Sequence, residues 1–159
     1  MFEPVRVQTH DFDLSEEIQS LRMGHRDIGA VVSFIGTVRD VNDNAHVTAL
    51  ELEHYPGMTE KALHSIRQQA HDRWPLQNSL IIHRIGQMQP TDQIVLVAVA
   101  SKHREAAFEA AHFIMDYLKT HAPFWKKETL PDGQTRWVDA RLSDDQAKQK
   151  WAAEVAPME

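Results

Sequence analysis

Apolar residues recur along the chain with two periods, which predict where strands and helices lie. β-branched or alternating apolar runs predict strands at about residues 4–9, 30–39, 47–55, 79–87 and 92–101. Apolar residues three or four apart predict helices at 14–24, 58–74 and 102–120. The chain then predicts a hairpin of strands 124–130 and 134–140 and a C-terminal helix from Ser143 that contains Trp151. Strands in adjacent pairs between helices indicate an α+β fold with a mixed or antiparallel sheet.

Two local features refine this pattern. Gly36 interrupts the strand 30–39, which predicts a β-bulge or a close backbone approach there. Residues 40–46, DVNDNAH, are rich in Asn and Asp and predict a polar loop. No repeat or flexible linker divides the chain, so we expect one domain over residues 1–159.

Composition excludes several classes of protein. A hydrophobic content of 42% and a charged content of 25% are typical of a globular protein, and no segment is apolar enough to span a bilayer. The net charge of −6 argues against a nucleic-acid or membrane partner. No secretory signal is visible and the chain has no Cys, so we expect a cytoplasmic protein without thiolate chemistry.

Basic residues nevertheless gather in one part of the chain. Residues 102–127 hold five Lys or Arg against three acidic side chains, whereas the rest holds 12 basic and 20 acidic ones. His103 and Arg104 stand at the predicted start of a helix, where an anion such as phosphate would compensate cations that the helix dipole disfavours. A solvated first turn explains them equally well. Arg39 stands at a strand end, where a charged residue often lines a site, although an ordinary edge position explains it equally well.

The segment KTHAPFWKKE (119–128) mixes lysines with aromatic residues. Pro123 ends the helix that carries Lys119, and the extended run after it places Phe124 and Lys126 on one face, opposite Lys127. Partial desolvation and a neighbouring cation favour a neutral amine, which can act as a base or nucleophile. Ordinary surface lysines are the alternative.

The ten histidines suggest a metal site, but their spacing does not support one. No HExxH, HxH or clustered His and carboxylate pattern is present, and P-loop, GxGxxG and GxSxG motifs are also missing. We therefore expect no metal.

Five blocks of sequence together resemble the large, catalytic subunits of molybdopterin synthase. These blocks are FIGTVRD (34–40), LEHYPGMTEKAL (52–63), IIHRIGQM (81–88), SKHREAAFEA (101–110) and FIMDYLKTHAPFWKKE (113–128). The resemblance covers about residues 28–141, and the tail from about 143 to 159 carries little of it. It implies an α/β-hammerhead-type fold with an added small β subdomain.

The resemblance also implies a function. The family transfers sulfur to cyclic pyranopterin monophosphate (precursor Z) and so forms the dithiolene of molybdopterin. The sulfur comes from the thiocarboxylated C-terminus of a small ubiquitin-like subunit, without a further cofactor, and two large subunits form the centre of a 2+2 heterotetramer. The competing interpretation is a non-catalytic dimeric module that binds a pterin or nucleotide phosphate.

Site residues follow from the matching positions. Lys119 and Lys126 match the family's catalytic lysines. The substrate-binding positions matched are Thr37, Val38 and Arg39, His103 and Arg104 from the second large subunit, and Lys127 and Glu128 beside the pocket.

The helix 102–120 leads to a prediction about assembly. At 1.5 Å per residue, Arg104 and Lys119 lie about 22 Å apart along its axis, too far to touch one small ligand in one chain. We expect an antiparallel contact between two copies of this helix to bring opposite ends together. Sedimentation should therefore detect a homodimer, and a fully active monomer would contradict the prediction.

Overall fold

A computed structural model of the chain describes residues 1–42, 45–138 and Trp151. Its elements are β1 (Val5–Gln8), α1 (Leu14–Arg22), β2 (Ala30–Thr37), β3 (Val41–Asn42), β4 (Ala45–His46), β5 (Ala49–His54), α2 (Met58–Arg73), β6 (Leu76–Arg84), β7 (Gly86–Met88), β8 (Gln93–Ser101), α3 (Arg104–His121), β9 (Phe124–Thr129) and β10 (Thr135–Val138). The predicted α+β class is confirmed. The C-terminal helix predicted from Ser143 lies outside the described residues, apart from Trp151, which is helical.

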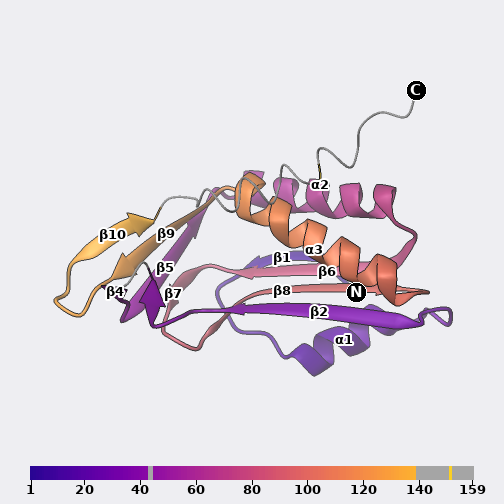
Figure 1. Ribbon diagram of the computed structural model, residues 1–159, viewed down its shortest axis with the longest axis horizontal. Helices are drawn as coiled ribbons and strands as arrows, with labels where there is room; N and C mark the ends of the chain where they lie inside the picture. The colour runs from indigo at the N-terminus through magenta and orange to yellow at the C-terminus, as the bar shows by residue number, and fades with distance from the viewer. Residues whose placement is uncertain (43–44, 139–150, 152–159) are drawn as a thin grey trace.

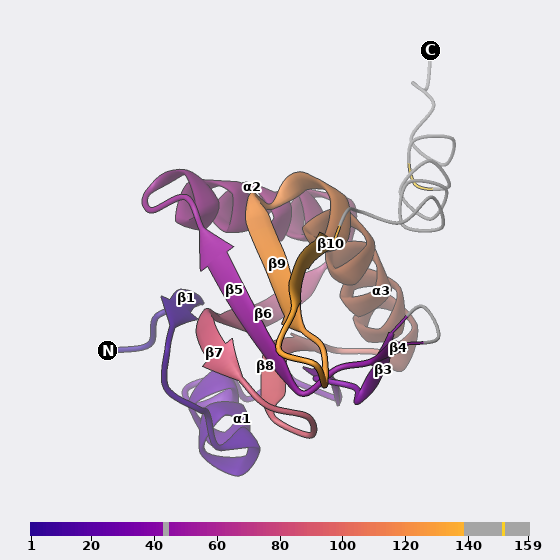
Figure 2. The same ribbon diagram turned by 90° about the vertical axis from the view of Figure 1, so that its left-hand side faces the viewer.

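The strands form two four-stranded sheets and one small ladder. The first sheet has the order β1-β6-β8-β2 and is mixed, because only β1 and β6 are parallel. The second sheet, β10-β9-β5-β7, is antiparallel and corresponds to the predicted small β subdomain. Figure 1 shows α2 and α3 on one face of the first sheet and α1 on the other, and Figure 2 looks onto the second sheet.

The apolar pattern of β6 and β8 explains this layering. Ile81 and Val97 point to the face covered by α2 and α3, whereas Leu80 and Leu96 point to the face covered by α1. All four side chains are fully buried. Strands that are apolar on both faces need cover on both sides, and the three helices supply it.

Two sequence expectations need correction. The strand predicted at 79–87 is two strands, since the chain bends around Ile85 and Gly86 (φ 87°) and passes from the first sheet into the second. The loop predicted at 40–46 contains a two-residue ladder between β3 and β4.

The β-bulge expected at Gly36 is confirmed, because the β2–β8 register shifts between Gly36 and Thr37. A Cβ at Gly36 would lie 2.8 Å from Val95 Cγ1. No described helix is long and apolar enough to cross a membrane.

Buried Thr59 ties the two parts of the fold together. Its hydroxyl accepts a hydrogen bond from the Tyr55 backbone N–H (3.0 Å) and donates one to the Pro123 carbonyl (3.1 Å). These bonds fix the chain after β5 against the turn between α3 and β9. The Thr59 side chain is fully buried, so its hydroxyl makes these bonds out of contact with water.

We therefore predict that Thr59→Val lowers the free energy of unfolding by about 1–3 kcal/mol, because it leaves the Tyr55 N–H and the Pro123 C=O without the Thr59 hydroxyl as their partner. The control is Thr48→Val, since Thr48 makes a similar hydroxyl bond to the Thr129 carbonyl (3.2 Å) but is exposed. Urea unfolding of both variants measures the difference. Equal losses would show that burial of Thr59 is not what matters.

Candidate active site

A pocket of about 390 Å³ lies where the two sheets meet the C-terminal end of α3. Its apolar walls come from β5 and from the last turns of α3, through residues that include Leu50, Leu52, Met115 and Leu118. Its polar side chains come from separate segments: Arg39 after β2, His83 near the end of β6, Lys119 on α3, and Lys126 and Glu128 on β9. The pocket therefore depends on the packing of the whole fold.

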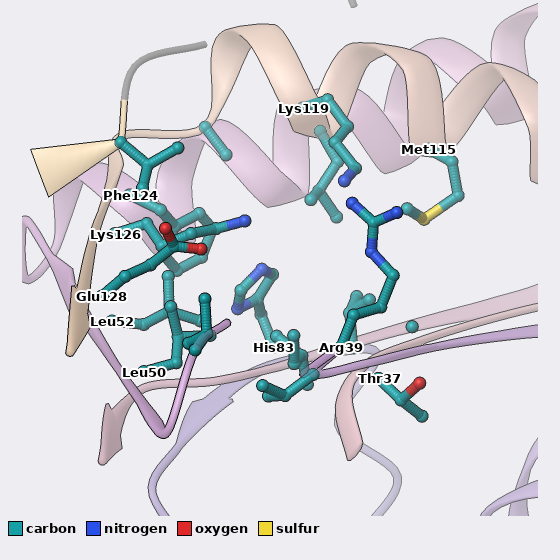
Figure 3. A pocket seen from close by; sticks show the side chains of 18 of the residues that line it. Thr37, Arg39, Leu50, Leu52, His83, Met115, Lys119, Phe124, Lys126 and Glu128 are labelled. Carbon is teal, nitrogen blue, oxygen red and sulfur yellow. The ribbon is translucent and has the colours of Figure 1, made fainter. Parts of the chain in front are cut away.

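Cations converge in this pocket. Figure 3 shows the side chains of Lys119 and Arg39 pointing toward each other, with Lys126 projecting into the same space from β9. Neither Lys119 nor Arg39 forms an ion pair with any residue that the structure describes. On Lys119 and Arg39, an anionic ligand would find charge that no described residue neutralises through an ion pair.

The alternation of β9 selects which side chains face the pocket. Phe124, Lys126 and Glu128 line it, and the first two share one face of the strand, as the alternation in the sequence predicted. Lys127 points to the other face, where its Nζ lies 5.7 Å from the ring centroid of Trp137. Any contact of Lys127 with a ligand would therefore come from outside this pocket.

Glu128 is the acidic group in the pocket lining. The residue is only 3% exposed, and its Oε1 accepts hydrogen bonds from Nε (3.0 Å) and a terminal nitrogen (2.9 Å) of Arg136. The two residues face each other across β9 and β10. Arg136 thus offsets the charge of Glu128 and holds the hairpin in place.

Thr37 and Val38, which were expected to bind substrate, contribute to the pocket in a different way from Arg39. Val38 is buried, and its backbone is already used: its N–H bonds to the Asp92 carbonyl (2.9 Å) and its C=O accepts from the Thr91 N–H (2.8 Å). Figure 3 shows the Thr37 hydroxyl pointing away from the lysines. Both residues line the pocket, and the turn at 91–92 fixes the backbone that carries Arg39.

His103 and Arg104 lie outside this pocket. They stand exposed at the start of α3, whereas Lys119 is in its last turn. His103 occupies the N-cap position without a side-chain capping bond. Their contribution to a second subunit's pocket stays a prediction, and it agrees with the length of the helix.

His83 is the pocket residue that the sequence did not single out. It is 6% exposed, and its ring stacks on Phe124 with centroids 3.8 Å apart and an interplanar angle of 18°. Burial, with smaller effects of the charges on Lys119, Lys126 and His54, lowers the pKa of His83 to about 4 despite a hydrogen bond to the Arg84 carbonyl. One feature of the sequence could have identified it. His83 lies two residues after Ile81, near the end of an apolar strand, so the two side chains share a strand face, and Ile81 is buried.

The described residues contain no group of three His, Cys, Asp or Glu side chains that could hold a metal ion. The expectation that no metal takes part stays a prediction. The groups that the pocket does offer are primary amines, a guanidinium, a buried imidazole and one carboxylate. These suit anion binding and proton transfer.

Known proteins resemble this chain in sequence and in fold. A family model described as MoaE protein matches residues 7–121. The molybdopterin synthase catalytic subunit of Ralstonia nicotianae is 61% identical over 147 residues, which are 92% of this chain and 83% of the relative. The solved molybdopterin biosynthesis MoaE protein of Burkholderia ambifaria has a TM-score of 0.81 at 54% identity, covering 95% of this chain and 99% of that one.

A more distant solved chain, from Helicobacter pylori, shares the fold with a TM-score of 0.71 at 19% identity, covering 87% of this chain and 92% of that one. It was solved in a protein–protein complex of subunits 1 and 2 of molybdopterin-converting factor. At this identity the likeness concerns the fold alone.

The buried state of His83 predicts how stability depends on pH. The folded-state pKa of about 4 lies below the ordinary 6.5, so the unfolded chain binds the proton first as pH falls. The neutral ring's contribution is complete above pH 6.5 and is lost as pH falls toward 4, by about 3 kcal/mol in total.

Urea unfolding at several pH values should show this loss in the wild type and a shallower slope in His83→Gln, which cannot titrate. The comparison of slopes removes the contribution of His71, whose pKa is also lowered by burial. Parallel curves for the two proteins between pH 6.5 and 4 would contradict the assignment.

Proposed function

This chain belongs to the MoaE protein family, and we propose that it is the catalytic subunit of molybdopterin synthase. In this role it transfers sulfur from the thiocarboxylated C-terminus of a small ubiquitin-like subunit to cyclic pyranopterin monophosphate, forming the dithiolene of molybdopterin. The observation that carries the proposal is the convergence of Lys119, Lys126 and Arg39 in one pocket. Both reactants are anions, and the pocket presents cations to them.

The two lysines supply the chemistry in this proposal. When a thiocarboxylate reacts, negative charge develops on oxygen, and an ammonium group at that point stabilises it. Lys119 takes this role or transfers a proton, and Lys126 positions the donor or the substrate. Arg39 holds polar and phosphate groups of the substrate, since its guanidinium can bond two oxygens at once. Glu128 keeps Arg136 in place beside them.

The assembly in this proposal has two kinds of partner. The small subunit inserts its C-terminal tail into the pocket, and a second copy of this chain contributes His103 and Arg104. The length of α3 supports the second part, because these residues and Lys119 occupy opposite ends of one 18-residue helix. The Helicobacter pylori complex supports the first only by similarity of fold.

Neither a metal nor a resident cofactor is required in this proposal, because the partner supplies the sulfur and this chain has no Cys to carry it. The absence of Cys also supports a cytoplasmic location. The alternative of a non-catalytic phosphate-binding module is disfavoured by relatives that are named catalytic subunits.

Lys119→Ala tests the proposal directly. We expect it to lower product formation by at least about 100-fold, comparable with the loss of one charge-stabilising group. Binding of the small subunit should remain close to that of the wild type. Lys61→Ala is the matched control, since Lys61 is an exposed lysine of α2 outside the pocket.

The assay mixes the protein anaerobically with thiocarboxylated small subunit and precursor Z and detects the dithiolene product. Near-normal turnover by Lys119→Ala would refute the role of Lys119. Absence of product from the wild type would favour the non-catalytic alternative.

A further inference from the structure

The ring of His83 is buried, but it forms part of the pocket lining. The residue is 6% exposed, and its ring stacks on Phe124 with centroids 3.8 Å apart. Figure 3 shows the ring projecting into the same space as the ends of Lys119 and Lys126. Buried polar atoms need hydrogen-bond partners, so the partner of each ring nitrogen decides what the ring can bind.

The hydrogen bond of the ring fixes its tautomer. Nδ1 lies 2.8 Å from the Arg84 carbonyl oxygen, which can only accept, so Nδ1 carries the hydrogen. In the neutral ring, Nε2 then has a lone pair and no hydrogen. No residue in the described parts of the chain hydrogen-bonds Nε2, and this nitrogen is not enclosed by protein. Nε2 is therefore an acceptor that a ligand in the pocket can use.

The surroundings of the ring keep it neutral. Burial is the main cause of the lowered pKa of His83, and the charges on Lys119, Lys126 and His54 add to it. A proton on Nε2 would bring a further positive charge into a pocket that already holds cations. At neutral pH, Nε2 therefore accepts a hydrogen bond and does not donate one.

The other polar groups of the pocket suit a different part of a ligand. Lys119, Lys126 and Arg39 only donate hydrogen bonds, so they suit the oxygens of an anion. The carboxylate of Glu128 already accepts two bonds from Arg136. The imidazole adds an uncharged acceptor, which suits an N–H or O–H group of the ligand.

Of the two reacting groups in the proposed function, the pterin is the one with a hydrogen to donate. An ionised thiocarboxylate only accepts hydrogen bonds, so the lysines suit it and Nε2 does not. A reduced pterin is flat and carries N–H groups along its edge. Leu52 and Phe124 give the pocket apolar walls against which such a ring can pack.

We propose that His83 binds the substrate: its Nε2 accepts a hydrogen bond from a ring N–H of the pterin, while the cations of the pocket hold the anionic groups. The proposal rests on the proposed function, because the pterin is the substrate only if this chain is the catalytic subunit. The contact also makes the pocket selective. An inorganic anion satisfies the cations but leaves Nε2 without a donor.

Nuclear magnetic resonance of the ¹⁵N-labelled full-length protein tests this contact without turnover. In the free protein at neutral pH, we expect the nitrogen shifts of a neutral His83 ring with hydrogen on Nδ1. Precursor Z should move the Nε2 resonance in the direction of a hydrogen-bonded acceptor. Sulfate, which has no hydrogen to donate, should leave that resonance in place. Equal shifts with both ligands, or hydrogen on Nε2 in the free protein, would overturn the proposal.

Calorimetry measures the contribution of the contact to binding. In His83→Asn the short amide keeps a donor for the Arg84 carbonyl but has no atom at the Nε2 position. We expect this variant to bind precursor Z about 10-fold more weakly, as for the loss of one hydrogen bond, and to bind the small subunit as the wild type does. His83→Gln, whose longer side chain brings its amide oxygen to that position, should retain most of the affinity.

The matched control is His64→Asn, since His64 is exposed on α2 and lies outside the pocket. It should bind precursor Z with wild-type affinity. Equal affinities of His83→Asn and His64→Asn would overturn the proposal. A loss confined to binding of the small subunit would also overturn it, because it would assign Nε2 to the partner's tail.

Sulfur transfer by the wild type decides the proposed function separately. A wild type that forms product, but whose Nε2 resonance does not respond to precursor Z, refutes the role of His83 alone. A wild type that does not bind precursor Z refutes both proposals. If His83→Asn does not fold, the contrast between precursor Z and sulfate in the wild type decides the role of His83.

Discussion

β6 and β8 carry apolar side chains on both faces, and each face has to be covered before these strands can leave water. α1 covers one face, and α2 and α3 cover the other. α3 ends at His121, and beyond this point β9, which begins at Phe124, covers the same face of the first sheet. The pocket lies at this change from helix to sheet, because a helix end and a strand cannot close on the first sheet as tightly as a continuous helix does.

The same junction explains why the pocket is polar. Helix α3 ends with Lys119 in its last turn, where the helix dipole favours a cation. β9 begins directly after Pro123, and its alternation directs Lys126 toward the end of the helix. Arg39 arrives from the bulged end of β2, where the register shift at Gly36 changes the direction of the backbone. Cations from three segments thus meet because α3 and β2 end, and β9 begins, in the same part of the fold.

Much of this arrangement could be predicted from the sequence. The helix 102–120 and the face shared by Phe124 and Lys126 followed from periodicity and from Pro123, and both are local properties. The division of the predicted strand 79–87 could not be read in the same way, since the apolar run continues through Ile85 and only packing between two sheets shows where the chain bends. His83 was missed for a related reason. Strand alternation shows which face its side chain shares, but only the folded structure shows that this face borders the pocket.

The position of His83 bears on how an acidic protein can hold several cations close together. Like charges in a partly buried pocket repel each other, and a further protonated group beside Lys119, Lys126 and Arg39 would increase that repulsion. The imidazole is the side chain that can be present there without charge, and burial against Phe124 keeps it so. The pocket thereby keeps its positive charge for the anions that enter it, although the chain as a whole carries −6.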